Sequence, residues 1–366
     1  MVKKIRLYVF GYRDQSFWCE YGPVVRDLMI VSALCELDVV DSVEFYNRPV
    51  TWPEILLRRK KIGYPDVGSK KITFMSKLSF DVFGPLRKRL WVKDAYNIHY
   101  NTQPDFSGDY INVVLDFLPI GELPAWIGEA DVYWYDLIDN FTKHNRYTEA
   151  EKKQVSKKYQ SIAKYAGNNL VTGVSASALS EFSNAHVLEN AILKLPKIIK
   201  GAESSMFDFG FMGFMSNKFD IDAVKKICTL GYSVAIYGEF YDKDTEKELL
   251  KVSGAKLFGR FRDTDVDMLL STFRIGLIPY KNELLHDESP LKLYQYLSAF
   301  KLVLSSFDFD FKHDMFYVYD ANDFESKVSS VMLDLDENKT LSESEMYQFT
   351  WECRVQSIVR FLVSSK

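Results

Sequence analysis

Residues 287–298 read Asp287-Glu288-Ser289-Pro290-Leu291-Lys292-Leu293-Tyr294-Gln295-Tyr296-Leu297-Ser298, and the apolar run Leu302-Val303-Leu304 follows them. This stretch predicts a helix that leads into a strand. Ser289 suits the N-cap of that helix, since its hydroxyl can accept a hydrogen bond from an amide of the first turn. Pro290 suits the first helical position, where no amide donor is needed. Lys292 then lies in the first turn, where the positive end of the helix dipole disfavours a cation.

The position of Lys292 indicates an anion site. A bound phosphate would remove the conflict with the dipole, because the free amides, the dipole and the ammonium group all favour negative charge. Glu288, Lys292 and Gln295 are spaced at i, i+4 and i+7, so they share one face of the helix. The alternative is a surface helix in which Asp287 and Glu288 satisfy the dipole and Lys292 is simply solvated.

A longer run around this helix resembles a known family. Residues 276–305, GLIPYKNELLHDESPLKLYQYLSAFKLVLS, resemble the nucleotide-sugar-binding half of GT-B glycosyltransferases, particularly the family 4-like enzymes of bacterial surface-polysaccharide biosynthesis. Those enzymes carry a strand ending in Ile-Pro, a short Asn-Glu loop, then Ser-Pro-Leu-Lys-Leu-Tyr and a second strand. The resemblance is strong over 207–305, recognisable over 130–192 and 350–361, and faint before residue 100.

The composition is that of a globular protein. The chain has 366 residues, 47% of them apolar, which is enough for two domains with separate cores. Its net charge of −4 provides no general attraction for nucleic acid. No apolar run reaches the roughly 18 residues of a transmembrane helix, and the strand-like N-terminal segment is too short for a signal peptide. The scattered cysteines and histidines show no metal-ligand spacing, so we expect no metal site and no cofactor.

Strand and helix patterns alternate along the chain, as in Rossmann-like domains. In the first half, residues 4–10 predict a buried strand, 11–18 a loop and 22–37 a helix. Further strands are predicted at 43–46, 96–100, 111–115 and 131–135. In the second half, strands and helices alternate from residue 209 to residue 279, which predicts a parallel sheet.

The resemblance implies an α/β protein with the GT-B fold, in which two Rossmann-like domains face each other across a cleft. We expect an N-terminal acceptor-binding domain at 1–195 and a C-terminal nucleotide-sugar-binding domain at 196–349. Residues 350–366 would form a helix that crosses back to the first domain. The stretch 193–206, with its proline and lysines, is the candidate linker.

The resemblance also implies which residues bind the donor. Lys292 would neutralise the leaving diphosphate, beside Ser289 and the amides of residues 290–292. Gln295 stands where the family has a carboxylate for the ribose, and Phe300 stands where it has a glycine. Gly213 and Gly238 end strands, where bare backbone either admits a diphosphate or only forms a tight turn. The expected donor-binding residues are Gly213, Gly238, Lys256, Phe258, Arg260, Glu283, Asp287, Ser289, Pro290, Leu291, Lys292 and Gln295.

Asp136 and Asp139 follow a predicted strand at the end where open α/β folds bind ligands. With Lys292, they are the catalytic candidates that the resemblance implies. If the reaction inverts the anomeric centre, one of these carboxylates must take the proton of the acceptor hydroxyl, whereas a retaining reaction needs no such base. The alternative is that one carboxylate caps the next helix or pairs with Lys143 or Arg146.

Residues 58–93 hold eleven basic residues and two acidic ones, a local charge of +9. Aromatic and aliphatic residues interleave with the cations, which is typical of segments that contact an anionic membrane surface. A solvated basic face and attraction of nucleic acid are the alternatives. We expect peripheral contact with an anionic membrane and no nucleic-acid partner.

These features predict a metal-independent glycosyltransferase of the hexosyltransferase class. It would move a sugar from a nucleotide-diphosphate donor, a UDP-sugar by expectation, to a lipid-linked saccharide acceptor in capsule or O-antigen biosynthesis. Its expected place is the cytoplasm, peripheral to the inner face of the cytoplasmic membrane. The alternatives are a sugar-nucleotide 2-epimerase of the same fold, and a non-catalytic protein that binds nucleic acid or membrane through 58–93.

Overall fold

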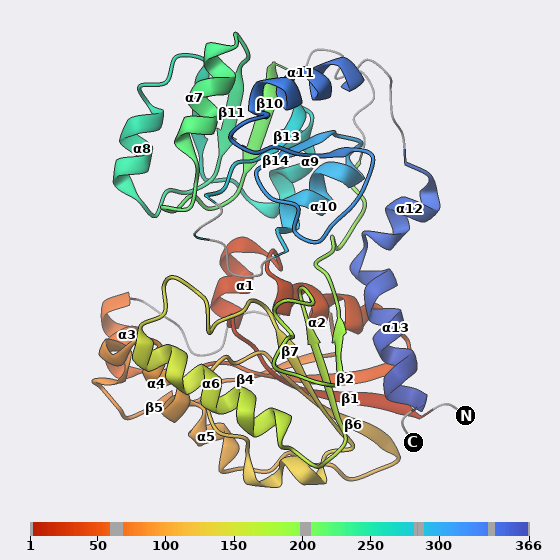
Figure 1. Ribbon diagram of the computed structural model, residues 1–366. Coiled ribbons are helices and arrows are strands. Elements are labelled where there is room, and N and C mark those ends of the chain that lie inside the picture. The colour runs from red at the N-terminus through yellow and green to blue at the C-terminus, as the bar shows by residue number, and fades with distance from the viewer. Residues whose placement is uncertain are drawn as a thin grey trace. The chain divides into compact units, whose positions relative to one another are not determined.

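The computed structural model (Figure 1) describes residues 3–58, 69–197, 206–281, 284, 289–335 and 341–364. The described chain forms two compact units. Unit 1 is made of residues up to 189 together with 351–364, and unit 2 is made of residues between 190 and 350.

Unit 1 is built on a seven-stranded parallel sheet in the order β4-β2-β1-β6-β7-β8-β9. β2 and β4 follow on one side of β1, and β6 to β9 follow on the other side. The strand order therefore reverses between β1 and β6, as in a Rossmann sheet. A separate pair of short strands, β3 and β5, is also parallel. The strands are β1 (Lys4–Phe10), β2 (Val40–Tyr46), β3 (Val50–Thr51), β4 (Ile72–Met75), β5 (Leu78–Ser79), β6 (Tyr110–Asp116), β7 (Val132–Leu137), β8 (Asn169–Gly173) and β9 (Ala185–Val187).

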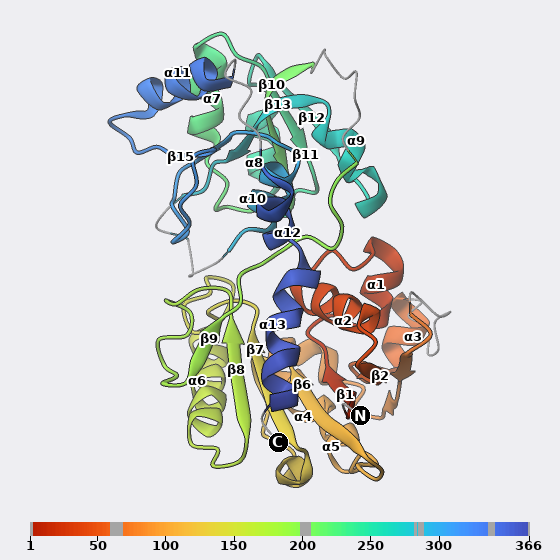
Figure 2. The same ribbon diagram turned by 90° about the vertical axis from the view of Figure 1, so that its right-hand side faces the viewer.

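Helices cover both faces of this sheet. α2 packs against α13 on one face, and α6 lies on the other (Figure 2). α6 begins at a capping box, in which the Thr148 hydroxyl accepts from the Glu151 amide and the Glu151 carboxylate accepts from the Thr148 amide. The helices are α1 (Gln15–Tyr21), α2 (Arg26–Glu36), α3 (Trp52–Arg58), α4 (Arg89–Ala95), α5 (Asn97–Tyr100), α6 (Glu149–Ala163) and α13 (Trp351–Ser364), with 3₁₀ turns η1 (Gly84–Arg87) and η2 (Ala125–Glu129).

Two sequence predictions in unit 1 are wrong. Residues 96–100 form helix and not strand, because the Tyr100 amide bonds the Tyr96 carbonyl, and both rings pack against Phe10 from one helical face. The second half of the predicted loop at 11–18 belongs to helix α1, because Asp14 caps this helix by accepting from the Phe17 amide at 3.0 Å.

Unit 2 is built on a six-stranded parallel sheet in the order β12-β11-β10-β13-β14-β15, which reverses between β10 and β13. α7 and α8 cover one face of it, while α9 and α10 cover the other (Figure 2). The strands are β10 (Phe207–Met212), β11 (Val234–Tyr237), β12 (Ala255–Gly259), β13 (Phe273–Ile278), β14 (Val303–Ser305) and β15 (Phe316–Val318). The helices are α7 (Ile221–Thr229), α8 (Lys243–Leu249), α9 (Val266–Leu270), α10 (Leu291–Ser298), α11 (Phe324–Asp334) and α12 (Glu343–Gln348), with a 3₁₀ turn η3 (Asp263–Asp265).

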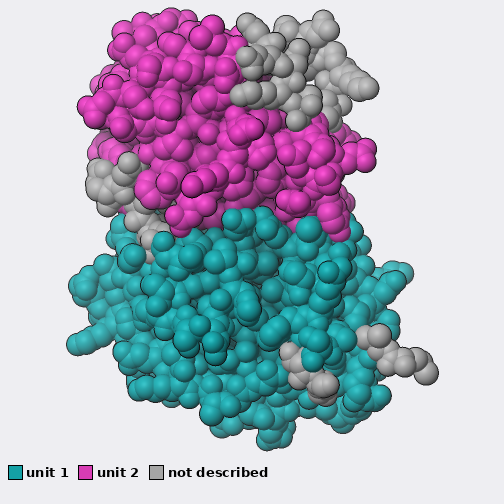
Figure 3. Space-filling model, turned by 45° about the vertical axis from the view of Figure 1, so that its right-hand side comes forward, with its two compact units in different colours: residues 1–189, 286–288, 351–366 teal, residues 190–285, 289–350 magenta. Residues whose placement is uncertain are grey.

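Glu189 belongs to unit 1 and Asn190 to unit 2, whereas Thr350 belongs to unit 2 and Trp351 to unit 1; Figure 3 colours the two units separately. Arg354 of α13 donates to the Glu189 carboxylate at 2.6 Å. The domain boundaries expected from the sequence, after residues 195 and 349, stay predictions.

Candidate functional site

The reversal point of the unit 2 sheet gathers residues from three elements. Open α/β sheets bind ligands there, beyond the carboxyl ends of the strands. Gly213 directly follows β10, and Tyr280 lies two residues beyond β13. Lys292, in the first turn of α10, extends to both: its Nζ donates to the Tyr280 hydroxyl, and a Cβ built on Gly213 would lie 3.3 Å from that Nζ. We call Gly213, Tyr280 and Lys292 the Lys292 site.

Aromatic rings position the ammonium group of Lys292. Its Nζ lies 4.9 Å from the ring centroid of Phe211 and 5.0 Å from that of Tyr280. Ring faces attract a cation at these distances. Lys218 brings a second ammonium group, 4.6 Å from the Tyr280 centroid. Two positive charges therefore lie beside one tyrosine ring, where charge-assisted hydrogen bonds to a phosphate would be strong.

The two candidate glycines have different roles. Gly213 and Gly238 both have φ of +140°, a conformation that other residues rarely adopt. A Cβ on Gly238 would lie 1.8 Å from the carbonyl oxygen of Gly213, so Gly238 is needed for close contact between two chain segments. A Cβ on Gly213 would lie 3.2 Å from Lys292 Cε. Gly213 thus provides the space into which the Lys292 side chain extends.

The start of α10 corrects one sequence prediction. Pro290, with an extended ψ of 122°, is the N-cap, and Leu291 is the first helical residue. The hydroxyl of Ser289 lies 3.0 Å from the Tyr294 hydroxyl and does not cap the helix. The N-cap residue therefore makes no side-chain hydrogen bond to the first turn, where the Leu293 amide donates to the Pro290 carbonyl at 3.0 Å. The side-chain amide of Asn190 donates to the Ser289 carbonyl at 2.5 Å and fixes the chain just before the helix.

Strand β12 places its aromatic side chain, Phe258, against Tyr237 at the end of β11. The Phe258 ring stacks on Tyr237 at 4.6 Å and contacts the Phe207 ring edge-on at 5.7 Å. Phe207 is the first residue of β10, whereas Tyr237 is the last residue of β11. Lys256 follows the Phe258 ring, since its Nζ lies 5.0 Å from the Phe258 centroid.

The remaining donor-binding candidates are Arg260, Gln295, Glu283 and Asp287. Arg260 is exposed directly after β12, and Gln295 is partly exposed on α10, one turn beyond the Lys292 site. Glu283 and Asp287 lie outside the described residues. The structure thus brings Gly213 and the first turn of α10 together. The binding roles of all these residues stay predictions.

In unit 1, Asp136 is a buried partner of Arg26. Arg26 donates through Nε and Nη2 to the two carboxylate oxygens, each at 2.7 Å, and Thr172 donates to Oδ2 at 2.6 Å. The Asp136 side chain is 0% exposed. With both oxygens bonded and no solvent access, this carboxylate is poorly placed to take a proton from a substrate. The predicted alternatives do not hold for Asp136, because its ion-pair partner is Arg26 and not Lys143 or Arg146, and the next helix is capped by Thr148.

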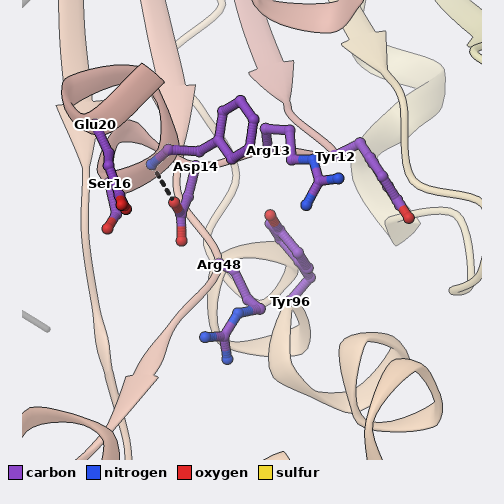
Figure 4. Close-up of a pocket in the computed structure, with 8 residues that line it drawn as sticks. Tyr12, Arg13, Asp14, Ser16, Glu20, Arg48 and Tyr96 are labelled. Atoms are coloured by element: carbon purple, nitrogen blue, oxygen red, sulfur yellow. Dashed lines mark hydrogen bonds between the residues drawn. The ribbon is translucent and has the colours of Figure 1, made fainter. Parts of the chain in front are cut away.

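A pocket of about 280 Å³ lies at the carboxyl ends of β1 and β2 (Figure 4). The loop after β1 supplies Tyr12, Arg13 and Asp14, and the segment after β2 supplies Arg48. Asp139, in the loop after β7, is partly exposed and does not line the pocket. The lining residues are Tyr12, Arg13, Asp14, Ser16, Phe17, Glu20, Arg48 and Tyr96.

A buried carboxylate, that of Asp27, bonds the loop that forms this pocket. The Arg13 amide donates to Asp27 Oδ2 at 2.6 Å. Burial raises the pKa of Asp27 to about 6, although the hydrogen bond from Arg13 opposes this. The Arg13 guanidinium lies 5.2 Å from the Tyr12 centroid and 4.8 Å from the Phe17 centroid. The pocket therefore combines a cation held on aromatic rings with the carboxylate of Asp14.

Within the described ranges, no group of three or more His, Cys, Asp or Glu side chains is placed to hold a metal ion. No helix of the described chain has the length and apolar character needed to cross a membrane.

Comparison with known proteins places this geometry in a fold. No family model and no curated protein matches the sequence. AviGT4, a glycosyltransferase involved in avilamycin A biosynthesis, is 12% identical, with 100% of this chain and 99% of its own covered, at a TM-score of 0.53. The likeness spans the whole chain and both reversing sheets. The chain has the GT-B fold.

Two further GT-B-like structures are more distant. The UDP-GlcNAc 2-epimerase of Methanocaldococcus jannaschii, in complex with UDP-GlcNAc and UDP, is 10% identical over 99% of each chain, at a TM-score of 0.49. UGT89C1 of Arabidopsis thaliana, complexed with UDP-L-rhamnose, is 11% identical over 99% of this chain and 100% of its own, at 0.47. The predicted α/β class with two Rossmann-like sheets is confirmed by the topology and by AviGT4.

Within the GT-B fold, sequence reasoning missed several residues of both reversal points. Tyr280 and Phe211, which hold Lys292, look like ordinary strand residues in the sequence. The pocket residues Tyr12, Arg13 and Asp14 lie in a segment that we predicted to be a featureless loop. Only the positions of these residues in the sequence could have identified them. A polar or aromatic residue just after a buried parallel strand lies at the ligand-binding edge of the sheet.

Proposed function

We propose that this protein is a glycosyltransferase that takes a sugar from a nucleoside-diphosphate donor, with UDP-sugars as the favoured class. The observation that carries the proposal is the Lys292 site. An ammonium group lies over a bare glycine at the reversal point of a Rossmann sheet, beside the uncapped first turn of α10. A diphosphate is the leaving group whose developing charge such a set of donors stabilises, without a requirement for metal.

The acceptor would bind in the pocket of unit 1. An inverting reaction needs a carboxylate that takes the proton of the acceptor hydroxyl. Asp14 lines the pocket and is better placed for this than Asp136, which is buried against Arg26. Asp139 stays a second candidate, and a retaining reaction would need neither. A lipid-linked saccharide in capsule or O-antigen synthesis, handled at the inner face of the cytoplasmic membrane, is the acceptor that the basic segment 58–93 favours.

The test compares Lys292→Met with the intact protein. We expect UDP to bind the intact chain and to raise its melting temperature, and we expect Lys292→Met to weaken that binding about tenfold or more, because it removes a charge-assisted contact. Sugar transfer from a UDP-sugar should be lost in the same variant, and Lys292→Arg should recover part of it. Lys247→Met, on the exposed helix α8, is the matched control and should change nothing.

Two results would contradict the proposal. The first is that no nucleoside diphosphate shifts the melting temperature of the intact protein. The second is that UDP binds Lys292→Met as well as it binds the intact chain. Epimerisation of UDP-GlcNAc at C2 in the absence of any acceptor would instead support the epimerase alternative.

A further inference from the structure

Exposed apolar side chains of unit 1 gather in one region. Leu57 and Phe80 are 83% and 82% exposed, and Leu86 and Leu56 are 77% and 74% exposed. Outside residues 52–86, Val187 is the one large apolar side chain that is exposed in the described part of unit 1. We define the apolar surface as Trp52, Leu56, Leu57, Phe80, Phe83 and Leu86.

These six residues come from two segments that leave the same small sheet. β3 pairs with β5 in parallel, with Thr51 opposite Ser79. α3 begins directly after β3, and the loop that carries Phe80 and Phe83 begins directly after β5. Because parallel strands end at the same edge, both segments start side by side, and Figure 1 shows α3 close to β5 and α4.

Arg48 contacts both α3 and α4 and so connects the two segments. Its guanidinium donates to Glu54 of α3 at 2.6 Å and lies 4.7 Å from the ring centroid of Trp91 on α4. The turn η1 packs on the same tryptophan, since a Cβ on Gly84 would lie 2.0 Å from Trp91 Nε1. The exposure pattern of α3 is therefore the reverse of the usual one, because the acidic Glu54 is buried and the apolar Leu56 and Leu57 are exposed. A helix that faced only water would have the opposite pattern.

Basic side chains are frequent in the segment that carries Phe80, Phe83 and Leu86. Residues 69–93 contain seven basic residues and one acidic residue, Asp81, which pairs with Arg87. Lys70, Arg87 and Lys88 are exposed. An exposed apolar surface in a segment with an excess of positive charge complements a bilayer whose headgroups are anionic and whose interior is apolar. A protein partner would not by itself account for both features.

We propose that this apolar surface docks on an anionic lipid bilayer. Leu57 and Phe80 enter the acyl-chain boundary, and the exposed Lys70, Arg87 and Lys88 contact the headgroup phosphates. The inference rests on the proposed function for its setting, since a lipid-linked acceptor lies at such a surface. Its test measures vesicle binding without any sugar donor, so its failure and the failure of the proposed function are distinguishable.

The experiment is co-sedimentation of the full chain with vesicles of phosphatidylcholine alone or with about 30% phosphatidylglycerol. We expect binding to the anionic vesicles, weakened by salt at about 0.5 M. Leu57→Ser with Phe80→Ser should weaken the partition about tenfold or more, since both side chains would leave the lipid for water. Both residues are almost fully exposed, so the circular dichroism spectrum should not change.

The matched control is Leu250→Ser with Leu333→Ser, two exposed leucines of unit 2 that lie outside the apolar surface. This variant should bind vesicles like the intact chain. Absence of binding to anionic vesicles, or equal binding by the Leu57→Ser/Phe80→Ser variant, would overturn the proposal. Self-association that the Leu57→Ser/Phe80→Ser variant abolishes, in a chain that ignores vesicles, would also overturn it and would assign the apolar surface to a second copy.

Discussion

At the scale of single residues, the carboxylates of unit 1 differ in what they can do. Asp136 is bonded through both oxygens to Arg26 and to Thr172, inside the protein. Asp14 lines a pocket and uses one oxygen, Oδ1, to cap α1. Burial and bonding favour a structural role for Asp136, whereas access to the pocket favours a chemical role for Asp14.

The first prediction concerns Asp136→Asn. The substitution leaves the Arg26 charge buried without an anionic partner, so we expect the free energy of unfolding to fall by about 3 kcal/mol. Urea unfolding measures it. Asp14→Asn is the matched control, because asparagine is an equally good N-cap and stability should hardly change. A variant at Asp136 that keeps full stability and loses only turnover would restore the catalytic role for this residue.

Single residues were predictable from sequence only where local chemistry contradicted local structure. Lys292 could be found because a cation in the first turn of a helix conflicts with the dipole. Asp14 could not be found, because an aspartate in an apparent loop is ordinary. Arg26 and Asp136 lie 110 positions apart, and no local rule pairs residues at that separation.

At the scale of elements, α10 ends in a way that explains a departure from the family. Phe300 has φ of +56°, the left-handed conformation. The Lys301 amide bonds the Tyr296 carbonyl at 3.0 Å, and the Phe300 amide bonds the Leu297 carbonyl at 2.9 Å. These two bonds make a Schellman motif with Phe300 at the C′ position, which usually holds glycine.

The second prediction follows from this motif. Phe300→Gly and Phe300→Ala both lose the ring, so their difference isolates the backbone. We expect the glycine variant to be more stable than the alanine variant by about 1 kcal/mol, because only glycine adopts positive φ without strain. Thermal unfolding of both variants measures it.

The matched pair is Ser329→Gly and Ser329→Ala, at an exposed position inside α11, where alanine should be more stable by about 1 kcal/mol. Equal stability of the two Phe300 variants would contradict the left-handed assignment.

Elements were predicted well where their pattern was long and periodic. β10, β11, β13 and β14 of unit 2, with β1, β6 and β7 of unit 1, are mainly apolar runs of the kind that a buried parallel sheet requires. Residues 96–100 misled, because alternation over five residues fits a strand as well as one face of a short helix. The short strands β3 and β5 carry no pattern at all, since each has two residues and exists only through its partner.

At the scale of the whole molecule, the reversing strand order of both sheets joins residues far apart in the chain. β1 pairs with β6 across about a hundred positions, and no local pattern predicts that pairing. The two-sheet architecture was therefore reached through the resemblance and not through periodicity. Unit 1 is also discontinuous, because α13 completes it from the far end of the chain.

The last prediction tests that discontinuity. Trp351, at the start of α13, is fully buried; its Nε1 donates to Met29 Sδ at 3.3 Å, and Arg26 lies 5.2 Å from its ring centroid. Trp351→Ala should lower the unfolding free energy of unit 1 by about 3–5 kcal/mol, through lost burial and a cavity. Unit 2 contains no residue of α13, so its amide exchange and its binding of UDP should persist. Hydrogen exchange resolved along the chain distinguishes the units. Equal loss of protection in β1 and β10 would show instead that the two units unfold as one.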